Sequence, residues 1–434
     1  MRYEKEITRQ EIFDVVVVGG GVAGFTAAVA AARTGAHTAL IEDSGALGGI
    51  LTTGLNPQIG IFYAYKKQVI AGIGWELCKR LEKQGFAEIP NFEKIDTSLG
   101  GIPSNVKVVP AMAEAEMLAM CKESGVSLFF HTKAVDATVK KEKVTALIAA
   151  DKNGLRCFTA SVFIDCSGDG DFAVFCGAEY EKSKTLQPGT YGYSFHTTNL
   201  DELTEETLRT AFTTAREKGE LCHGDFWPEY HAPIKNFFIE GGDNANHIAF
   251  DGSDADDLTR AEIEGRDRMA RMMKFASSQA NIVIHPSAAN VSARETRRIT
   301  CDYKMSVADF LTGRLYEDSI CYGYYNMDLH SDKKGQAFDS ENQTLPPCVI
   351  PAIPYRSLTV KGFINLLVAG RCAGFDRRVM GALRVKAPCM AMGEAVGTAA
   401  ALSLPQGNVK TVDMQMLKQR LTNNGAIVPK KDFI

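Results

Sequence analysis

The sequence predicts an α/β fold in which a doubly wound, mainly parallel sheet carries a small antiparallel insert, and a separate α+β domain is inserted. Three observations support this. Four valines, 15–18, run into a glycine-rich turn and an alanine-rich segment, which is typical of a strand followed by a helix. A second apolar strand, 37–41, follows Gly35, so the chain opens as a strand-helix-strand unit. Far along the chain, 363–369 again has the pattern of a buried strand.

The elements between these ends follow in order. Apolar residues at helical spacing predict a helix over 110–124. Strands are then expected over 126–131, 133–139, 143–150 and 156–164, and the middle two form the antiparallel insert. Further along we expect a strand over 191–196, helices over 201–219 and 259–279, and a helix that begins at Pro388.

The chain is long enough for two domains, and the predicted boundaries follow changes in composition. From Tyr191 onward, alternating aromatic residues and charged helices replace the strand-helix pattern. A proline-dense segment, 345–354, comes before the return of the buried strand. We therefore expect a discontinuous nucleotide-binding domain, 1–187 and 345–434, and a substrate or cap domain over 188–344.

Composition limits the partners. A net charge of −4 with a pI near 6.1 gives no field for nucleic acid or an anionic membrane surface, so neither partner is expected. The eleven cysteines are at least nine residues apart, which encodes neither a CxxC motif nor a metal site. With no signal peptide or apolar span, we expect a cytoplasmic protein. The oligomeric state stays open, a homo-oligomer included.

The glycine-rich turn is the strongest motif. Gly19, Gly21 and Gly24 permit a tight turn and a close approach of the backbone to a pyrophosphate, which the following helix N-terminus favours. Glu42 ends the second strand eighteen residues after Gly24, where an acid can bind a ribose hydroxyl. The order of strand, glycines, small-residue helix, strand and acid predicts a dinucleotide site.

Three further segments indicate which dinucleotide binds. A second glycine-rich loop, 45–54, follows the ribose acid, and 162–171 is a strand that runs into a turn of small residues. The third segment, 370–397, joins a strand end to a helix with a stripe of small residues, which also fits plain helix packing.

With these motifs in this order, residues 13–403 resemble the FAD-dependent oxidoreductase family. This family is a branch of the glutathione-reductase-type flavoproteins and is distantly similar to the flavoprotein subunits of fumarate reductase and succinate dehydrogenase. The resemblance implies a Rossmann-like FAD-binding domain, a second domain, and redox chemistry at a flavin between the two.

The resemblance also implies which residues meet FAD. The pyrophosphate would face Gly19, Gly21, Ala23 and Gly24, and the adenosine would lie near Glu42, Asp43 and the Val135 backbone. The ribityl chain and the ring would follow Gly48, Gly49, Thr52 and Thr53, and the chain would pass under the nucleotide at Ser167 and Gly168. Gly370 and Arg371 would approach the ribityl-phosphate region, and the isoalloxazine would meet residues from Gly381 to Met392, Ala382 included. Some relatives attach FAD covalently through a histidine near the second glycine loop. No histidine lies between His37 and His131, so we expect non-covalent FAD.

Candidate catalytic residues are arginines and a few proton-transfer groups. Arg294 and Arg384 could bind a substrate carboxylate bidentately, although salt bridges or FAD phosphates are alternative partners. If Arg294, Arg297 and Arg298 lie on a strand, the first and last share a face. Candidate proton donors or acceptors are Tyr193, His196 and His330, the last with Asp328 nearby; core packing or a solvated ring is the alternative for each.

The expected function is hydride transfer between FAD and a small polar, carboxylated molecule, with direction and electron acceptor open. One alternative is a flavin-dependent RNA-modifying protein, because 55–60 resembles a loop of that class. A non-catalytic FAD-binding protein is another. A pyridine-nucleotide disulfide reductase is disfavoured by the missing CxxC.

Overall fold

A seven-stranded sheet forms the centre of the larger part of the molecule. The computed structural model describes residues 4, 6–98, 102–242, 244–336, 338–431 and 433. The parallel strands lie in the order β8 (Ser127–Phe129), β2 (Thr38–Ile41), β1 (Arg9–Val18), β11 (Gly154–Asp165), and β18 (Leu366–Val368) pairs with the end of β11. The first half of β11 instead pairs antiparallel with β10 (Lys143–Asp151), which pairs with β9 (Lys133–Lys140). The predicted fold class is confirmed.

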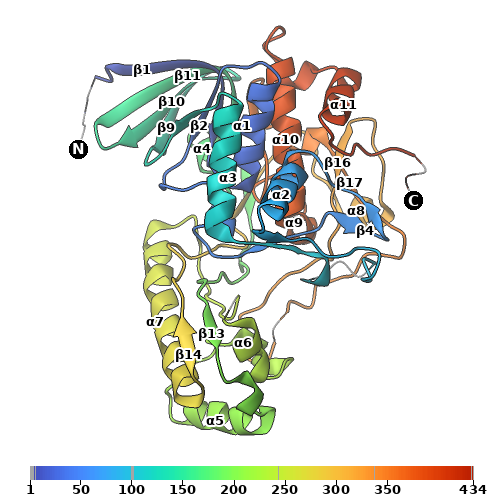
Figure 1. Cartoon of the computed structure of the whole chain (residues 1–434). Helices are drawn as coiled ribbons and strands as arrows, with labels where there is room; N and C mark the ends of the chain where they lie inside the picture. The colour runs from blue at the N-terminus through green and yellow to red at the C-terminus, as the bar shows by residue number, and fades with distance from the viewer. Residues whose placement is uncertain are drawn as a thin grey trace.

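Helices cover this sheet, and two of them lie side by side although they are distant in the sequence (Figure 1). These are α1 (Val22–Arg33) and α10 (Lys386–Leu402), and α2 (Ile73–Lys83) and α3 (Pro110–Glu123) pack beside them. A Cβ atom at Gly393 would lie 2.1 Å from the Ala23 carbonyl oxygen, and one at Gly397 would lie 2.1 Å from that of Ala27. The stripe of small residues on α10 is therefore needed for close helix packing.

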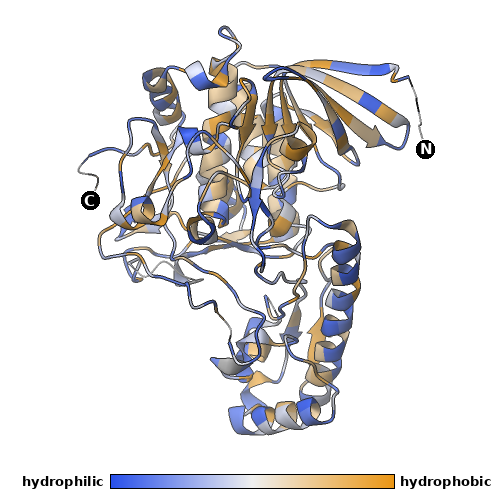
Figure 2. Ribbon diagram, turned by 180° about the vertical axis from the view of Figure 1, so that it is seen from behind, coloured by the Kyte–Doolittle hydropathy of each residue, from blue (hydrophilic) through white to orange (hydrophobic). Residues whose placement is uncertain are grey.

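A smaller part of the molecule lies below the sheet in Figure 1. It contains α5 (Glu205–Glu217), α6 (Lys235–Glu240), α7 (Ala255–Gln279), β13 (Phe195–Thr197) and β14 (Ile282–Ile284). It has its own apolar core, made of residues between 191 and 288. We call this part the cap. Figure 2 shows the orange apolar residues concentrated in the sheet and its helices, with blue polar residues along the cap helix α7.

The larger core contains Ile299, Phe310 and Ile320. The segment after residue 296 therefore packs with the sheet, and the predicted cap boundary at 344 stays a prediction.

The remaining elements are short. They are β3 (Gln58–Ile59), β4 (Tyr63–Ala64), β5 (Lys67–Gln68), β6 (Ala87–Glu88), β7 (Val106–Val108), α4 (Asp171–Phe175), β12 (Tyr180–Lys182), β15 (Arg297–Ile299), α8 (Val307–Thr312), β16 (Ser319–Tyr322), β17 (Ala352–Pro354), α9 (Arg377–Leu383) and α11 (Met414–Asn423).

Several predicted boundaries differ, and three of them have a local cause. The helix predicted over 259–279 begins at Ala255 because the Asp254 side chain accepts a hydrogen bond from the Asp257 amide as an N-cap. The helix predicted from 201 begins at 205 for the same reason, with Thr204 as its cap. The strand predicted over 191–196 shortens because the Tyr191 amide donates to the Asn246 side chain instead of a neighbouring strand.

Candidate functional site

The first glycine turn, Gly19–Gly24, connects β1 to α1 and leaves open space at one position. A Cβ atom at Gly24 would lie 1.8 Å from the Gly19 carbonyl oxygen, and one at Gly19 would lie 2.6 Å from that of Cys166. At Gly21, by contrast, a Cβ atom would meet nothing within 4 Å. Gly21 precedes α1, which has neither a side-chain cap nor an acid in its first turn. The free amides and positive helix end therefore fit a pyrophosphate.

Glu42 lies beside this turn and closes it. One carboxylate oxygen accepts from the Gly20 amide at 2.6 Å, and the other accepts from the Ser44 amide at 2.9 Å. Burial raises the pKa of Glu42 above its ordinary value. The first of these oxygens, Oε2, keeps accepting capacity for a ribose hydroxyl, whereas Oε1 also accepts from the Ser44 hydroxyl, and Asp43 is exposed. Val135 lies in β9 at an irregularity where it has no partner in the β10 register, which leaves its backbone available.

The second glycine loop lies against the first, since the Gly48 amide donates to the Gly20 carbonyl at 2.8 Å. Gly48 (φ 104°) and Gly49 (φ 54°) adopt the left-handed conformation that glycine favours. The Thr52 and Thr53 hydroxyls donate within the loop, to the carbonyls of Leu47 and Gly49 at 2.5 and 3.0 Å. The role predicted for these hydroxyls along the ribityl chain stays a prediction.

The ends of β11 and β18 meet behind the first turn. Ser167 and Gly168 form the turn after β11, and a Cβ atom at Gly168 would lie 2.9 Å from an Arg371 nitrogen. A Cβ atom at Gly370 would lie 3.3 Å from that of Ala23. The carboxyl ends of three parallel strands thus bring the predicted residues together, as expected for a dinucleotide fold.

The residues predicted to face the flavin ring from the last helices are buried. Gly381, Ala382 and Met392 line none of the three pockets found among the described residues. The helix that carries Met392 begins at Lys386, two residues before the predicted start. The Lys386 ammonium is bound to the Asn56 side chain and the Gln58 carbonyl. The flavin role of these three residues stays a prediction.

A pocket of about 80 Å³ lies where the second glycine loop, the cap and the C-terminal segment meet. We call it the arginine pocket because three arginines line it. Its lining residues are Ile50, Gly54, Leu55, Asn56, Thr190, Gly192, Asn244, Ser292, Ala293, Arg294, Arg371 and Arg384. The structure therefore brings together three predicted site residues that are separated by up to ninety positions in the sequence.

Arg294 is a buried cation without a carboxylate partner among the described residues. It is 8% exposed, and its guanidinium donates to the Pro188 carbonyl at 2.6 Å and the Asn244 side-chain oxygen at 2.5 Å. Burial, reinforced by the positive charge of Arg384, lowers the pKa of Arg294 to about 9. The group stays charged at neutral pH, so its environment favours an anion.

Arg371 and Arg384 differ from Arg294 because each is paired. Arg371 contacts Asp169 at 2.8 Å, and Arg384 Nη2 lies 3.3 Å from Asp328 Oδ2. Two buried donors near this pair, Arg384 Nε and Gln187 Nε2, have no hydrogen-bond partner in the described part of the chain. They are available to an acceptor on a ligand.

His330 is buried on the far side of Asp328. Its Nε2 lies 3.2 Å from Asp328 Oδ2, and its Nδ1 lies 3.0 Å from Nε2 of His247. Burial and the positive charge of Arg294 lower the pKa of His330 to about 4. Burial alone would raise the pKa of Asp328. The contacts with His330 and Arg384 outweigh burial and lower this pKa to about 2.

Two predicted proton-transfer residues lie elsewhere. His196 is exposed on β13, paired with Val283 of β14, and lines none of the pockets of the described chain. Tyr193 is buried in the cap core, with its ring 6.5 Å from that of Phe237, and burial raises its pKa above the usual range. The structure does not bring either side chain to the arginine pocket.

The predicted arrangement of the arginine cluster is wrong in part. Arg294 precedes β15, and only Arg297 and Arg298 lie on that strand. Arg298 pairs with buried Glu295 at 3.0 Å, while Arg297 pairs with Asp171 at 2.6 Å. Arg294 and Arg298 therefore do not act from a shared face, because a turn separates them.

Several site residues escaped the sequence reasoning. Asn244 and Gln187 orient the two arginines, and His247 contacts His330. Tyr325 lies close enough to Asp328, Arg384 and Arg294 for their charges to act on its hydroxyl, whose pKa burial raises to about 12. None of these residues belongs to a motif, and their roles depend on long-range contacts.

The described residues contain no cluster of three or more His, Cys, Asp or Glu that could hold a metal ion. They also form no helix whose length and apolar character would suffice to cross a membrane.

The fold and the first glycine turn define a dinucleotide-binding α/β protein with an inserted cap. Residues 14–421 match the family described as FAD dependent oxidoreductase, so the chain belongs to this family. Its cofactor is FAD, and it is an oxidoreductase.

Two curated relatives match over short segments. A tRNA uridine 5-carboxymethylaminomethyl modification enzyme from Geotalea uraniireducens is 31% identical over 34% of this chain and 22% of its own length. Dihydrolipoyl dehydrogenase from Trypanosoma brucei brucei is 49% identical over 12% of this chain and 11% of its own. The chain thus matches about a fifth of the length of the first relative and about a tenth of the length of the second.

Solved structures with similar folds include a geranylgeranyl bacteriochlorophyll reductase-like protein from Thermoplasma acidophilum (13% identity, TM-score 0.46, 95% of this chain and 84% of that one). Another is p-nitrophenol 4-monooxygenase from Pseudomonas putida, with 12% identity and a TM-score of 0.47. The match covers 95% of this chain and 88% of that one.

Proposed function

We propose that this protein transfers a hydride between non-covalent FAD and a small substrate that carries a carboxylate, bound in the arginine pocket. Arg294 carries the proposal: a buried guanidinium with only neutral acceptors requires an anion to compensate its charge. The unpartnered donor Arg384 Nε lines the same pocket region and offers a second hydrogen bond.

The two arginines have complementary tasks. Arg294, held by Pro188 and Asn244, would supply the charge that neutralises the carboxylate. Arg384, fixed by Asp328, would orient the substrate carbon next to that carboxylate. When bound, FAD supplies the acceptor or donor of the hydride. The pocket's small volume, about 80 Å³, favours a small acid over a polymer.

Non-covalent FAD is supported by the positions of the histidines. His131 is near the glycine loops, since a Cβ atom at Gly45 would lie 2.9 Å from its Nε2. Gly45 follows Glu42, so His131 stands at the expected adenosine end. Heating the purified protein should release FAD into the supernatant; yellow colour retained in the precipitate would contradict non-covalent binding.

Titration of the flavin absorbance with malonate tests the anion clamp. Arg294→Met should weaken malonate binding about 100-fold, the loss expected for a charge-assisted hydrogen-bonded pair. Arg294→Lys should recover part of the affinity because the charge remains. Arg420→Met, at an exposed position, is the control and should bind malonate normally. Equal affinities in Arg294→Met and the control would refute the clamp.

A flavin-dependent RNA-modifying function is the second candidate, because 148 residues match the tRNA-modification enzyme. The net charge of −4 disfavours it. A salt-sensitive mobility shift with tRNA would support this candidate.

A further inference from the structure

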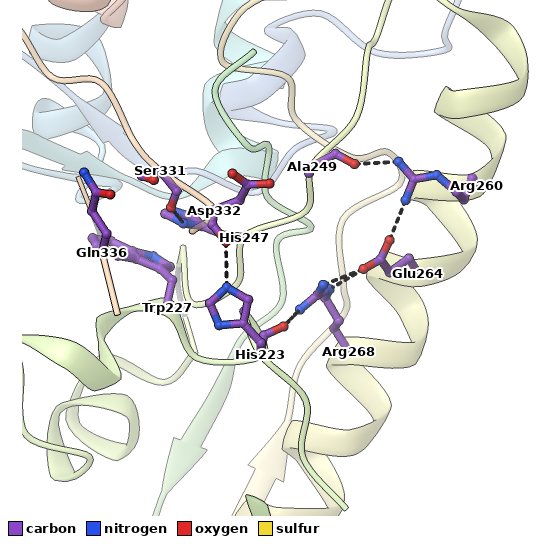
Figure 3. Close-up of a pocket in the computed structure, with 11 residues that line it drawn as sticks. His223, Trp227, His247, Ala249, Arg260, Glu264, Arg268, Ser331, Asp332 and Gln336 are labelled. Atoms are coloured by element: carbon purple, nitrogen blue, oxygen red, sulfur yellow. Dashed lines mark hydrogen bonds and ion pairs between the residues drawn. The ribbon is translucent and has the colours of Figure 1, made fainter. Parts of the chain in front are cut away.

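A second pocket, of about 130 Å³, lies between the cap and the segment 331–336. Figure 3 shows its polar wall, in which the His223 ring points to the Asp332 main-chain oxygen and the Arg260–Glu264–Arg268 network lines the opposite side. We call it the histidine pocket. Its lining residues are His223, Gly224, Trp227, His247, Ala249, Arg260, Glu264, Arg268, Ser331, Asp332 and Gln336.

An unbroken chain of polar contacts joins the two pockets. His247 Nδ1 lies 3.0 Å from the Ser331 carbonyl oxygen, and His247 Nε2 lies 3.0 Å from His330 Nδ1. His330 Nε2 then lies 3.2 Å from Asp328, whose same oxygen lies 3.3 Å from Arg384 of the arginine pocket. Each ring uses both of its nitrogens.

Packing holds the two rings in place. The His247 ring stacks on Trp227 with centroids 4.6 Å apart and planes 1° from parallel. The His330 ring meets the edges of Trp227 and Phe338 at 5.0 and 5.3 Å. His247 is 4% exposed and His330 is 7% exposed, so bulk water does not replace these contacts.

The contacts outnumber the available protons. Three contacts, Ser331 to His247, His247 to His330 and His330 to Asp328, need three hydrogens, because the carbonyl and the carboxylate only accept. Two neutral imidazoles carry two. Of the three possible arrangements, two keep a hydrogen between the rings, with the bare nitrogen either at His247 Nδ1 on the histidine pocket or at His330 Nε2 beside Asp328.

The surrounding charges keep both rings neutral near pH 7. Burial lowers the pKa of His247 and of His330, and the positive charge of Arg294 acts on both in the same direction. Asp328 is the opposing negative charge. The charged groups that face the pair are Arg268, Arg294, Arg384 and Asp328.

We infer that His247, His330 and Asp328 form a proton relay between the histidine pocket and the arginine pocket. When the substrate is reduced, one proton enters at His247 Nδ1, the His247 Nε2 proton moves to His330 Nδ1, and the His330 Nε2 proton leaves through Asp328 to the substrate. Both rings change tautomer, and the relay neither gains nor loses a proton.

Substrate oxidation moves the same proton in the opposite direction. This proton and the hydride exchanged with FAD together account for the two hydrogens that separate the oxidised and reduced substrate. The relay therefore rests on the proposed function, in which a substrate bound by Arg384 lies next to Asp328.

Nitrogen-15 NMR of the histidine-labelled holoenzyme tests the relay without a substrate. We expect a scalar coupling across the hydrogen bond between His247 Nε2 and His330 Nδ1, and near pH 7 the ring-nitrogen shifts of both histidines should report the same pair of exchanging tautomers. His247→Phe, which keeps the stacking on Trp227, and His247→Gln should each abolish the coupling. A missing coupling, or a single fixed tautomer in either ring, would overturn the relay.

Anaerobic bleaching of bound FAD by glycolate, lactate and malate adds a functional readout. With an acid that bleaches the wild type, His247→Phe should slow bleaching about 100-fold, as for loss of a general acid-base group, without weaker acid binding. The exposed control His285→Asn should bleach normally. Normal bleaching by His247→Phe would overturn the relay. If no acid bleaches the wild type and no corresponding oxo acid reoxidises the reduced enzyme, the proposed function fails, and the NMR result still decides the relay.

Discussion

The first glycine turn and the arginine pocket are built from different kinds of contact. In the turn, six consecutive residues, Gly19–Gly24, create the site through backbone geometry, and missing side chains leave the space for the ligand. In the arginine pocket, long side chains from the second glycine loop, the cap and the C-terminal segment converge. The turn therefore tolerates no added atom at Gly19 or Gly24, whereas the pocket depends on buried charges and their orientation.

The largest expected effect is that of Gly24→Ala. Its Cβ atom would lie 1.8 Å from the Gly19 carbonyl oxygen, so the backbone must shift, with an expected loss of about 3 kcal/mol in the free energy of unfolding. Gly21→Ala is the matched variant, because its Cβ atom meets only open space. It should unfold like the wild type and bind FAD more weakly. Urea denaturation of the apoproteins and FAD titration separate the two, and equal stability of both variants would contradict the packing argument.

The next effect concerns the pocket. Arg384→Met should weaken malonate binding about tenfold, less than Arg294→Met, because Arg384 is already paired with Asp328. FAD should remain bound, since none of the predicted phosphate contacts is changed. Isothermal titration with malonate checks the affinity, and a colourless Arg384→Met protein would show that the two regions are not separable.

The free energy of unfolding should depend on pH through His330, which lies next to the arginine pocket and far from the first glycine turn in the sequence. The pKa of His330 is lowered to about 4 from an ordinary value near 6.5, so the unfolded chain binds this proton more readily. The free energy of unfolding should fall as the pH drops from about 6.5 to about 4, by about 2 kcal/mol for this group. His330→Gln should flatten that part of the curve. Denaturant melts at several pH values with excess FAD measure it, and a steeper curve for the variant would contradict the assignment.

The smallest effect is expected for His196→Gln. This side chain is exposed on β13, so the free energy of unfolding should change by less than about 0.5 kcal/mol. FAD reduction by an active acid should also be unchanged. Thermal melts check the stability and anaerobic bleaching checks the reduction. A large loss of bleaching would show that His196 takes part in the reaction.

Much of the sheet was predictable because its signals are local. The valine run, the glycines and the alanine-rich helix specify β1, the turn and α1 within a few residues. Predicted boundaries failed where a side chain replaced a backbone partner, as Asn246 does for Tyr191. They also failed where a cap, Asp254, lies before the apolar pattern begins.

By itself the sequence determined the nucleotide-binding fold and the first glycine turn, because backbone geometry there depends on neighbouring residues. It also identified Arg294, Arg384 and His330 as candidates from their chemistry. Only the tertiary structure decided that the arginines converge, that His196 and Tyr193 lie elsewhere, and that His247 contacts His330. Those outcomes depend on burial and on pairings between residues some eighty or more positions apart, which local patterns do not encode.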